Sequence, residues 1–178
     1  MHTTIWAILS GLVNDEQATK MVESFECDDV RKCSFSMNFY LFRALEKCGC
    51  YEKAIDFFDG WQKMIDMHCT TWCENPDSPR SECHGWSSAP LYEFSANILG
   101  VKYSFDDIIK ISPVTWDLEY AKGIVPTRFG EVKVSWQKEN GSFKIKIESP
   151  ESVEKELILP DGTVKHFYDK LTEFKVNI

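Results

Sequence analysis

Chemically active side chains are concentrated in one stretch of the sequence, His68 to Trp86 (HCTTWCENPDSPRSECHGW). This polar, proline-containing stretch includes the carboxylate of Glu74 together with two histidines, two tryptophans and three cysteines. Functional side chains favour loops that a rigid scaffold positions. We therefore take this stretch as the candidate functional site.

Metal binding is the first chemistry to weigh at this stretch. The nominal zinc ligands are Cys69, Cys73, Cys83 and His84. Their spacing contains neither a C-x₂-C pair nor an H-x₃-H pair, and adjacent Cys83 and His84 rarely ligate one ion together. No thiol is marked out as an activated partner for a histidine either. The sequence thus predicts no metal and no cofactor, and an unrelated zinc protein is left as an alternative.

The cysteines give no disulfide pattern. All seven lie between Cys27 and Cys83, in an odd number and at irregular spacing. The prediction is free, mostly buried thiols in a reducing compartment.

Carbohydrate chemistry is the second possibility. Glycoside hydrolysis needs two carboxyl groups that flank the scissile bond, and aromatic rings beside them stack on the sugar. Glu74 could supply one of the two carboxyl groups. The neighbouring side chains that would line a sugar site are Trp72, His84 and Trp86.

Composition excludes several classes of protein. The chain has 178 residues, 43% hydrophobic and 13% aromatic, which is too much apolar surface for a disordered chain. Its net charge of −8 and its lack of a basic cluster argue against nucleic acid as a partner. No apolar stretch approaches the ~20 residues of a membrane span, so no membrane partner is expected. No basic residue precedes the first apolar run, so no signal peptide is predicted, and the location is cytoplasmic if Met1 is the native start.

Helical periodicity dominates the first half of the chain. Apolar stripes at helical spacing occupy residues 5–12 and 18–25, with Asn14 and Gln17 placed as a capping box for the second. Further helices are expected over 34–47, 51–67 and 87–100, with Gly49 ending the third and Pro90 in the first turn of the fifth. The short connection after residue 47 predicts antiparallel neighbours, hence a helical hairpin array.

Strand periodicity dominates the second half. Alternating segments at 131–136 and 142–147 flank Asn140 and Gly141, a strong hairpin signal. Later strands are expected over 155–159, 164–167 and 172–176. The fold class is therefore α+β. We expect a helical domain over residues 1–110 and a small antiparallel β-sandwich over 111–178.

The order of several motifs resembles the C-terminal part of bacterial α-L-rhamnosidases, a family of inverting glycoside hydrolases, along nearly the whole chain. The motifs are HTTIWAILSGL near the start, FYLFRALEKCG, TTWCE, CHGWSSAPLYEFSANILGV, AKGIVPTRFGEVKVSW and the ILPDGT turn. The most specific elements are Thr-Thr-x-x-Glu and His-Gly-Trp-Ser in this order. The resemblance implies the end of an (α/α)₆ catalytic barrel followed by a C-terminal β-sandwich.

The resemblance also implies roles for the candidate residues. By position, Glu74 matches the general base that activates water, and His84 matches a residue that contacts the sugar. Trp86 is placed to line the site or to pack in the core at the start of the fifth helix. The family often has tryptophan directly before the glutamate, whereas Cys73 stands there and Trp72 is one place earlier. The implied partner is an L-rhamnose-containing glycoside.

The general acid of the family lies in an Asp…Arg-Asp-Glu-type motif, and the 178 residues contain none. Five helices also cannot complete a twelve-helix barrel. The chain is therefore expected to be the C-terminal portion of such an enzyme and inactive alone. A homo-oligomer that covers exposed helical faces is a further expectation. The alternative is a non-catalytic carbohydrate-binding or vestigial scaffold protein.

Overall fold

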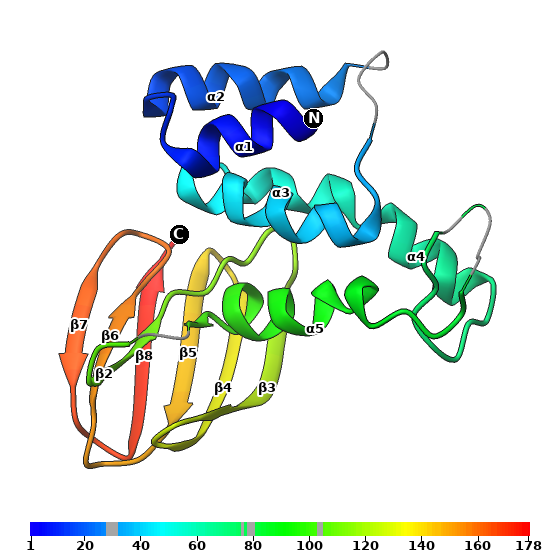
Figure 1. Ribbon diagram of the computed structural model, residues 1–178. Coiled ribbons are helices and arrows are strands. Elements are labelled where there is room, and N and C mark those ends of the chain that lie inside the picture. Colours follow the sequence, from blue (N-terminus) through cyan, green and yellow to red (C-terminus); the bar gives the residue numbers. More distant parts are fainter. Residues whose placement is uncertain (28–31, 76, 78–80, 103–104) are drawn as a thin grey trace. The chain divides into compact units, whose positions relative to one another are not determined.

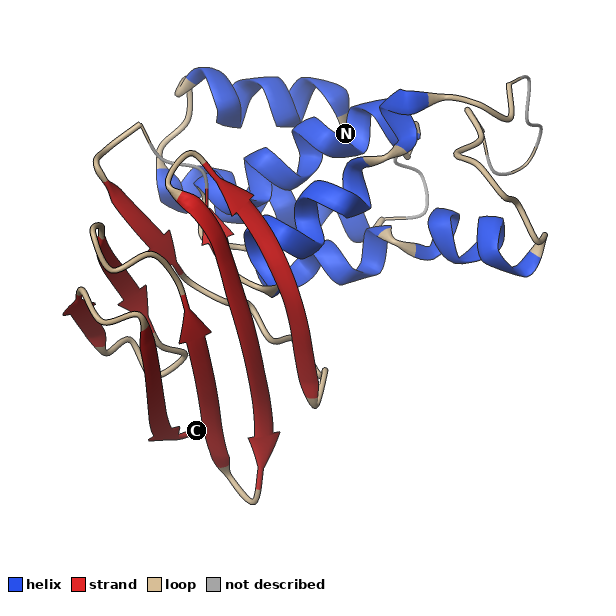
Figure 2. Ribbon diagram, turned by 90° about the horizontal axis from the view of Figure 1, so that it is seen from below, coloured by secondary structure: helices blue, strands red, loops and turns tan. Residues whose placement is uncertain are grey.

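The computed structural model describes residues 1–27, 32–75, 77, 81–102 and 105–178 (Figure 1). The chain forms two compact units, Met1–Pro90 and Leu91–Ile178. The described strands all lie in the second unit, which confirms the predicted α+β class with helices preceding a β-sandwich (Figure 2).

The helical segments are of two kinds. The α-helices are α1 (His2–Ser10), α2 (Asp15–Glu23), α3 (Phe35–Lys47), α4 (Asp59–Asp66) and α5 (Ala89–Glu93). The tighter or wider turns are the 3₁₀ segments η1 (Ser24–Glu26), η2 (Tyr51–Phe57) and η3 (Gly85–Ser87) and the π-helical η4 (Phe94–Ile98).

The predicted start of the second helix is confirmed. The Asn14 side chain accepts a hydrogen bond from the Gln17 backbone N–H at 2.9 Å, and the Gln17 side chain accepts one from the Asn14 N–H at 3.1 Å. These two bonds satisfy amide donors that the first turn leaves unpaired. The predicted end of α3 is also confirmed, since Gly49 takes the left-handed conformation with φ 71°.

The prediction of one long helix over residues 51–67 is wrong. A 3₁₀ segment, η2, comes first, and α4 begins only at Asp59. Gly60, a poor helix former, lies just after this change. A Cβ atom at Gly60 would come 2.6 Å from the Phe35 ring, so this position packs directly on the start of α3.

The fifth helix is shorter than expected. The α-helical part covers only Ala89–Glu93, with Pro90 in its first turn as predicted. The chain then widens into π-helical η4, and Leu99 donates its N–H to the Phe94 carbonyl at 2.8 Å. Apolar periodicity alone does not distinguish these two kinds of turn.

Aromatic side chains fill the core of the helical unit. The Phe35 and Trp61 rings lie 4.7 Å apart between centroids, and the Phe42 and Phe58 rings stack at 5.0 Å. Phe42 has no exposed surface. This cluster joins α3 to α4 and holds Trp61 at the base of the candidate site.

The second unit is a sandwich of two four-stranded sheets. One sheet has the order β1 (Val101–Lys102), β2 (Ile108–Ile111), β6 (Glu154–Ile158) and β7 (Val164–Phe167). The other has the order β3 (Tyr120–Thr127), β4 (Gly130–Glu139), β5 (Ser142–Glu148) and β8 (Leu171–Asn177). The Asn140–Gly141 hairpin between β4 and β5 is confirmed, with φ values of 50° and 69°.

One strand pair departs from the antiparallel prediction. Strands β2 and β6 run parallel, from Ile108 opposite Glu154 to Ile111 opposite Leu157. Parallel neighbours need a long crossover, and the β3–β5 segment of the second sheet supplies it.

The compact units divide between Pro90 and Leu91, before the domain boundary expected near residue 110. Ile98, Leu99 and Val101 belong to the same buried core as Ile109 and the strands that follow. Burial of these apolar side chains ties the segment after Pro90 to the sandwich.

Two findings concern membrane spanning and disulfides. Over the part of the chain that the structure describes, no helix is both long and apolar enough to cross a bilayer. All seven cysteines are free thiols, but the expectation that most are buried is wrong, since only Cys50 and Cys73 are buried.

Candidate functional site

The candidate site is a loop in which the segment around Glu74, the first arm, runs side by side with the segment around His84, the second arm. The Glu74 backbone N–H donates to the Ser81 carbonyl at 2.8 Å, and the His84 N–H donates to the Trp72 carbonyl at 2.7 Å. These bonds join the Thr-Thr-x-x-Glu element to the His-Gly-Trp-Ser element. Trp72, Glu74 and His84, which the sequence separates, are therefore brought together.

The loop begins with a sharp reversal at the end of α4. His68 takes a left-handed conformation, φ 57°, which is uncommon outside glycine. The following Cys69 N–H donates back to the Met64 carbonyl at 2.9 Å, which satisfies an acceptor left open by the helix end. His68 thus serves the backbone turn.

Cys73 fixes the first arm. It has no exposed surface, and its thiol donates to the Asn75 carbonyl at 3.4 Å. Trp72 and Glu74, on either side of it, are half-buried. The position at which the resembled family often has tryptophan is thus filled here by an inward thiol.

Trp61 and η3 fix the second arm. The Trp61 indole N–H donates to the carbonyl of buried Ser87 at 2.7 Å, and the Ser87 N–H donates to the His84 carbonyl at 3.0 Å. The Ser88 hydroxyl donates to the Gly85 carbonyl at 2.7 Å. Sequence reasoning missed the role of Trp61, because periodicity marks it as a core residue and cannot show where its indole N–H points.

Trp86 presents its ring to solvent. It is 75% exposed, so the alternative that it packs in the core is wrong. Its ring and that of half-buried His84 form a T-shaped pair, with 5.7 Å between centroids and 77° between planes. An exposed indole beside an imidazole offers both an apolar face and a hydrogen-bonding group to a ligand.

Burial works against the Cys73 thiol as a nucleophile. Burial raises the pKa of the Cys73 thiol above its ordinary value, and the pKa of Cys48, in the same unit, is raised to about 11 for the same reason. A catalytic cysteine needs the opposite shift, because the thiolate is the reactive form. Among the described residues, no three His, Cys, Asp or Glu side chains gather as they would around a metal ion.

The four side chains that the sequence singled out, Glu74, His84, Trp72 and Trp86, supply one carboxylate, one imidazole and two indoles. The Glu74 carboxylate can accept a proton from water, and the indoles can stack on a sugar ring. Lys63 of α4 pairs with Asp77 at 3.1 Å, which ties the loop to that helix.

Comparisons with known proteins place this arrangement in context. Residues 108–171 match the family model of the bacterial alpha-L-rhamnosidase C-terminal domain. No curated protein matches the sequence.

Solved structures with a similar fold include three α-L-rhamnosidases, each 19% identical to this chain. The enzyme of Dictyoglumus thermophilum has a TM-score of 0.84 over 98% of this chain and 25% of its own. The native enzyme of Aspergillus terreus has a TM-score of 0.85 over 97% of this chain and 23% of its own. The enzyme of Streptomyces avermitilis, complexed with L-rhamnose, has a TM-score of 0.81 over 98% of this chain and 21% of its own. This chain therefore has the fold of one segment of those proteins, and it spans about a quarter of their length.

Proposed function

From the rhamnosidase-like fold of the whole chain and the family match of residues 108–171, we infer that this chain is an α-L-rhamnosidase-like fragment, the C-terminal portion of an inverting glycoside hydrolase. Its substrate would be a terminal α-L-rhamnosyl linkage. The L-rhamnose in the Streptomyces avermitilis complex supports this choice of sugar.

Glu74 acts in this proposal as the general base. In an inverting hydrolase, water attacks the anomeric carbon while the glycosidic C–O bond breaks. The base takes a proton from that water, and a carboxylic acid on the opposite side gives a proton to the leaving oxygen. Trp72 and Trp86 would line the sugar, and His84 would hydrogen-bond to it.

One observation carries the assignment. The paired backbone bonds at Glu74 and His84 hold the carboxylate arm against the imidazole arm, so that a single ligand can touch both. Catalytic groups must be held in place within a fraction of an ångström, and backbone pairing supplies that rigidity.

The general acid would come from outside these 178 residues. The two carboxyl groups of an inverting site lie about 6.5–9.5 Å apart with sugar and water between them. The chain covers 21–25% of the three solved rhamnosidases, so the rest of the proposed barrel has ample room to carry the acid.

The 178-residue chain is therefore expected to show no turnover of an aryl α-L-rhamnoside above background, and Glu74→Gln should not change that. The turnover rate is measured from the absorbance of the aryl alcohol that is released. Turnover of about 1–10³ s⁻¹, the range of complete enzymes, would contradict the need for an outside acid. Loss of that turnover in Glu74→Gln would still leave Glu74 as the base.

The runner-up is a non-catalytic carbohydrate-binding or scaffold protein, which would use the same four side chains. Exposed Trp86 favours it, because sugar binding needs an aromatic face but no acid. The reading frame upstream of the Met1 codon separates the two. A continuing frame that encodes an acid motif supports the hydrolase, and a stop codon supports the binding protein.

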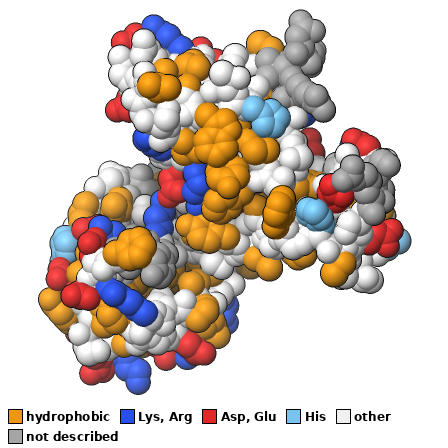
Figure 3. All heavy atoms as spheres, in the orientation of Figure 1, with side chains coloured by type: hydrophobic (Ala, Val, Ile, Leu, Met, Phe, Trp, Pro, Cys, Tyr) orange, Lys and Arg blue, Asp and Glu red, His pale blue; other side chains and the backbone are white. Residues whose placement is uncertain are grey.

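Self-association is a further part of the proposal. Aromatic side chains of α1 and α3 are partly exposed, with Trp6 packed on Tyr40 at 4.9 Å between centroids. The helical unit shows hydrophobic side chains on its surface (Figure 3). Such faces are covered either by further barrel helices or by a second copy of the chain.

A further inference from the structure

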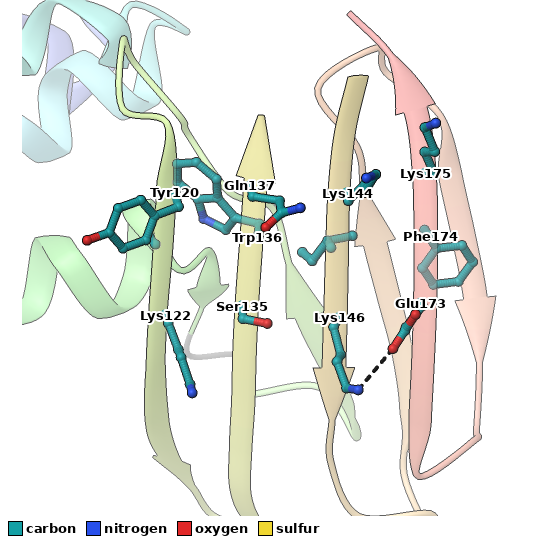
Figure 4. Close-up of a pocket in the computed structure, with 12 residues that line it drawn as sticks. Tyr120, Lys122, Ser135, Trp136, Gln137, Lys144, Lys146, Glu173, Phe174 and Lys175 are labelled. Atoms are coloured by element: carbon teal, nitrogen blue, oxygen red, sulfur yellow. Dashed lines mark ion pairs between the residues drawn. The ribbon is translucent and has the colours of Figure 1, made fainter. Parts of the chain in front are cut away.

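A second ligand-binding surface lies on the outer face of the sheet formed by β3, β4, β5 and β8. A hollow of about 620 Å³ opens there, lined by residues from all four strands (Figure 4). It belongs entirely to the second unit and shares no residue with the loop around Glu74.

Strand register arranges the outward side chains of the hollow in two parallel rows. The first row runs across the sheet as Tyr120, Gln137, Lys144 and Lys175. The second row runs as Lys122, Ser135, Lys146 and Glu173. We call these eight side chains the lysine face. Each row crosses three strand spacings, or about 14 Å, which is enough for a short oligosaccharide.

The lysine face is cationic on an acidic protein. It carries four lysines and one glutamate, whereas the whole chain has a net charge of −8. Two of the lysines, Lys144 and Lys175, lie directly opposite each other on neighbouring strands. Like charges at such positions destabilise a sheet unless an anion lies between them.

Carboxylates of the chain neutralise only part of this charge. Lys146 pairs with Glu173 at 2.9 Å, and Lys144 pairs with Glu139 at 3.2 Å. Within the described residues, Lys122 and Lys175 form no ion pair. Two ammonium groups at opposite edges of the hollow are thus available to a bound anion.

The remaining side chains favour a sugar over other anions. Tyr120 is 72% exposed at one end of its row and offers a ring face for stacking. Gln137 and Ser135 supply amide and hydroxyl groups of the kind that pair with sugar hydroxyls. Glu173 and the nearby Glu139 and Glu148 interrupt the positive charge, which disfavours a continuous phosphate backbone.

We propose that the lysine face binds an acidic oligosaccharide, with sugar carboxylates on Lys122 and Lys175 and a ring on Tyr120. Such a site would hold a charged glycan on the sandwich independently of any chemistry at Glu74. It would serve either of the two functions considered above.

The test is a binding titration of the complete 178-residue chain with a tetramer of α-1,4-linked D-galacturonic acid, followed by calorimetry. The methyl ester of the same tetramer keeps the rings but removes the charge. We expect the acid tetramer to bind, the ester to bind about 10-fold more weakly or worse, and the affinity for the acid to fall as salt is raised.

Matched variants locate the binding surface. Lys122→Gln with Lys175→Gln should weaken binding about 10-fold or more, and Tyr120→Ala should weaken binding while leaving the salt dependence unchanged. Lys20→Gln with Lys165→Gln removes the same charge from exposed positions elsewhere and should change the affinity less than about 2-fold.

Several results would overturn the proposal. The acid tetramer could fail to bind, or its methyl ester could bind with the same affinity. The two double-lysine variants could also lose the same amount of affinity. Binding of tetraglutamate or a (dT)₄ oligonucleotide as tight as that of the acid tetramer would also overturn it, because the face would then be a site for anions in general.

Discussion

Gly100→Ala is expected to destabilise the second unit by about 3 kcal/mol or more. A Cβ atom at Gly100 would lie 2.3 Å from the Pro113 backbone nitrogen and 2.5 Å from the Ser112 carbonyl carbon. Both neighbours are backbone atoms, so no side-chain rotation relieves the clash. The backbone there is also left-handed, with φ 80°, which costs about 1–2 kcal/mol for any residue with a Cβ.

Gly162→Ala is the matched control for this prediction. Gly162 has nearly the same conformation, φ 83°, but nothing lies within 4 Å of its added Cβ. The free-energy cost of Gly162→Ala should be that of the left-handed backbone alone, about 1–2 kcal/mol. Hydrogen exchange of amides in β4 and β5 reports on this unit by itself. Equal losses of protection in the two variants would show that the contact with Ser112 and Pro113 is unimportant.

Lys155→Met is expected to cost the sandwich about 3 kcal/mol. Lys155 has no exposed surface, and its ammonium donates to the carbonyls of Pro150, Val153 and Tyr168 at 2.7, 2.8 and 2.7 Å. Methionine fills a similar volume but leaves three carbonyls without this donor, of which the Val153 carbonyl is buried and the other two are partly buried. The Phe167 ring, 5.7 Å from the ammonium, also loses its cation.

Denaturant unfolding of the sandwich measures this cost, with exposed Lys165→Met as the control that should change stability by less than about 0.5 kcal/mol. A loss below about 1 kcal/mol for Lys155→Met would mean that water replaces the ammonium easily, contrary to its complete burial.

The same lysine should make stability depend on pH. Burial lowers the pKa of Lys155 below its ordinary value, against the opposing effect of nearby Asp169 and Glu151. Between the lowered pKa and the ordinary one near 10.4, the unfolded chain binds more protons than the folded chain. The free energy of unfolding contributed by this group therefore rises with pH in that window, and Lys155→Met should remove the rise.

Local chemistry made parts of the fold predictable. Asn14 and Gln17 cap a helix through atoms three residues apart, and Asn140 with Gly141 turns a hairpin without outside help. The split of the 51–67 helix was not predictable, since it involves packing of Gly60 on Phe35 from another helix. The parallel pairing of β2 with β6 likewise joins strands that are far apart in the chain.

The candidate site shows the same division. The residue types of the loop pointed to Glu74, Trp72, His84 and Trp86. The backbone pairing of Trp72 with His84 and of Glu74 with Ser81 depends on how the loop folds back, and no spacing rule reveals it. The lysine face was hidden for a similar reason, because its rows form only when four separate strands align.

The central claim is that the loop around Glu74 binds L-rhamnose, and indole N–H signals in an NMR titration test it most directly. The chain has six tryptophans, so each indole can be assigned by single substitution. We predict that L-rhamnose shifts the Trp72 and Trp86 signals. It should leave Trp136 unchanged, because that buried indole donates to the Ile98 carbonyl at 2.7 Å in the sandwich. Unchanged Trp72 and Trp86 signals at saturating sugar, or equal shifts with D-glucose, would contradict the claim.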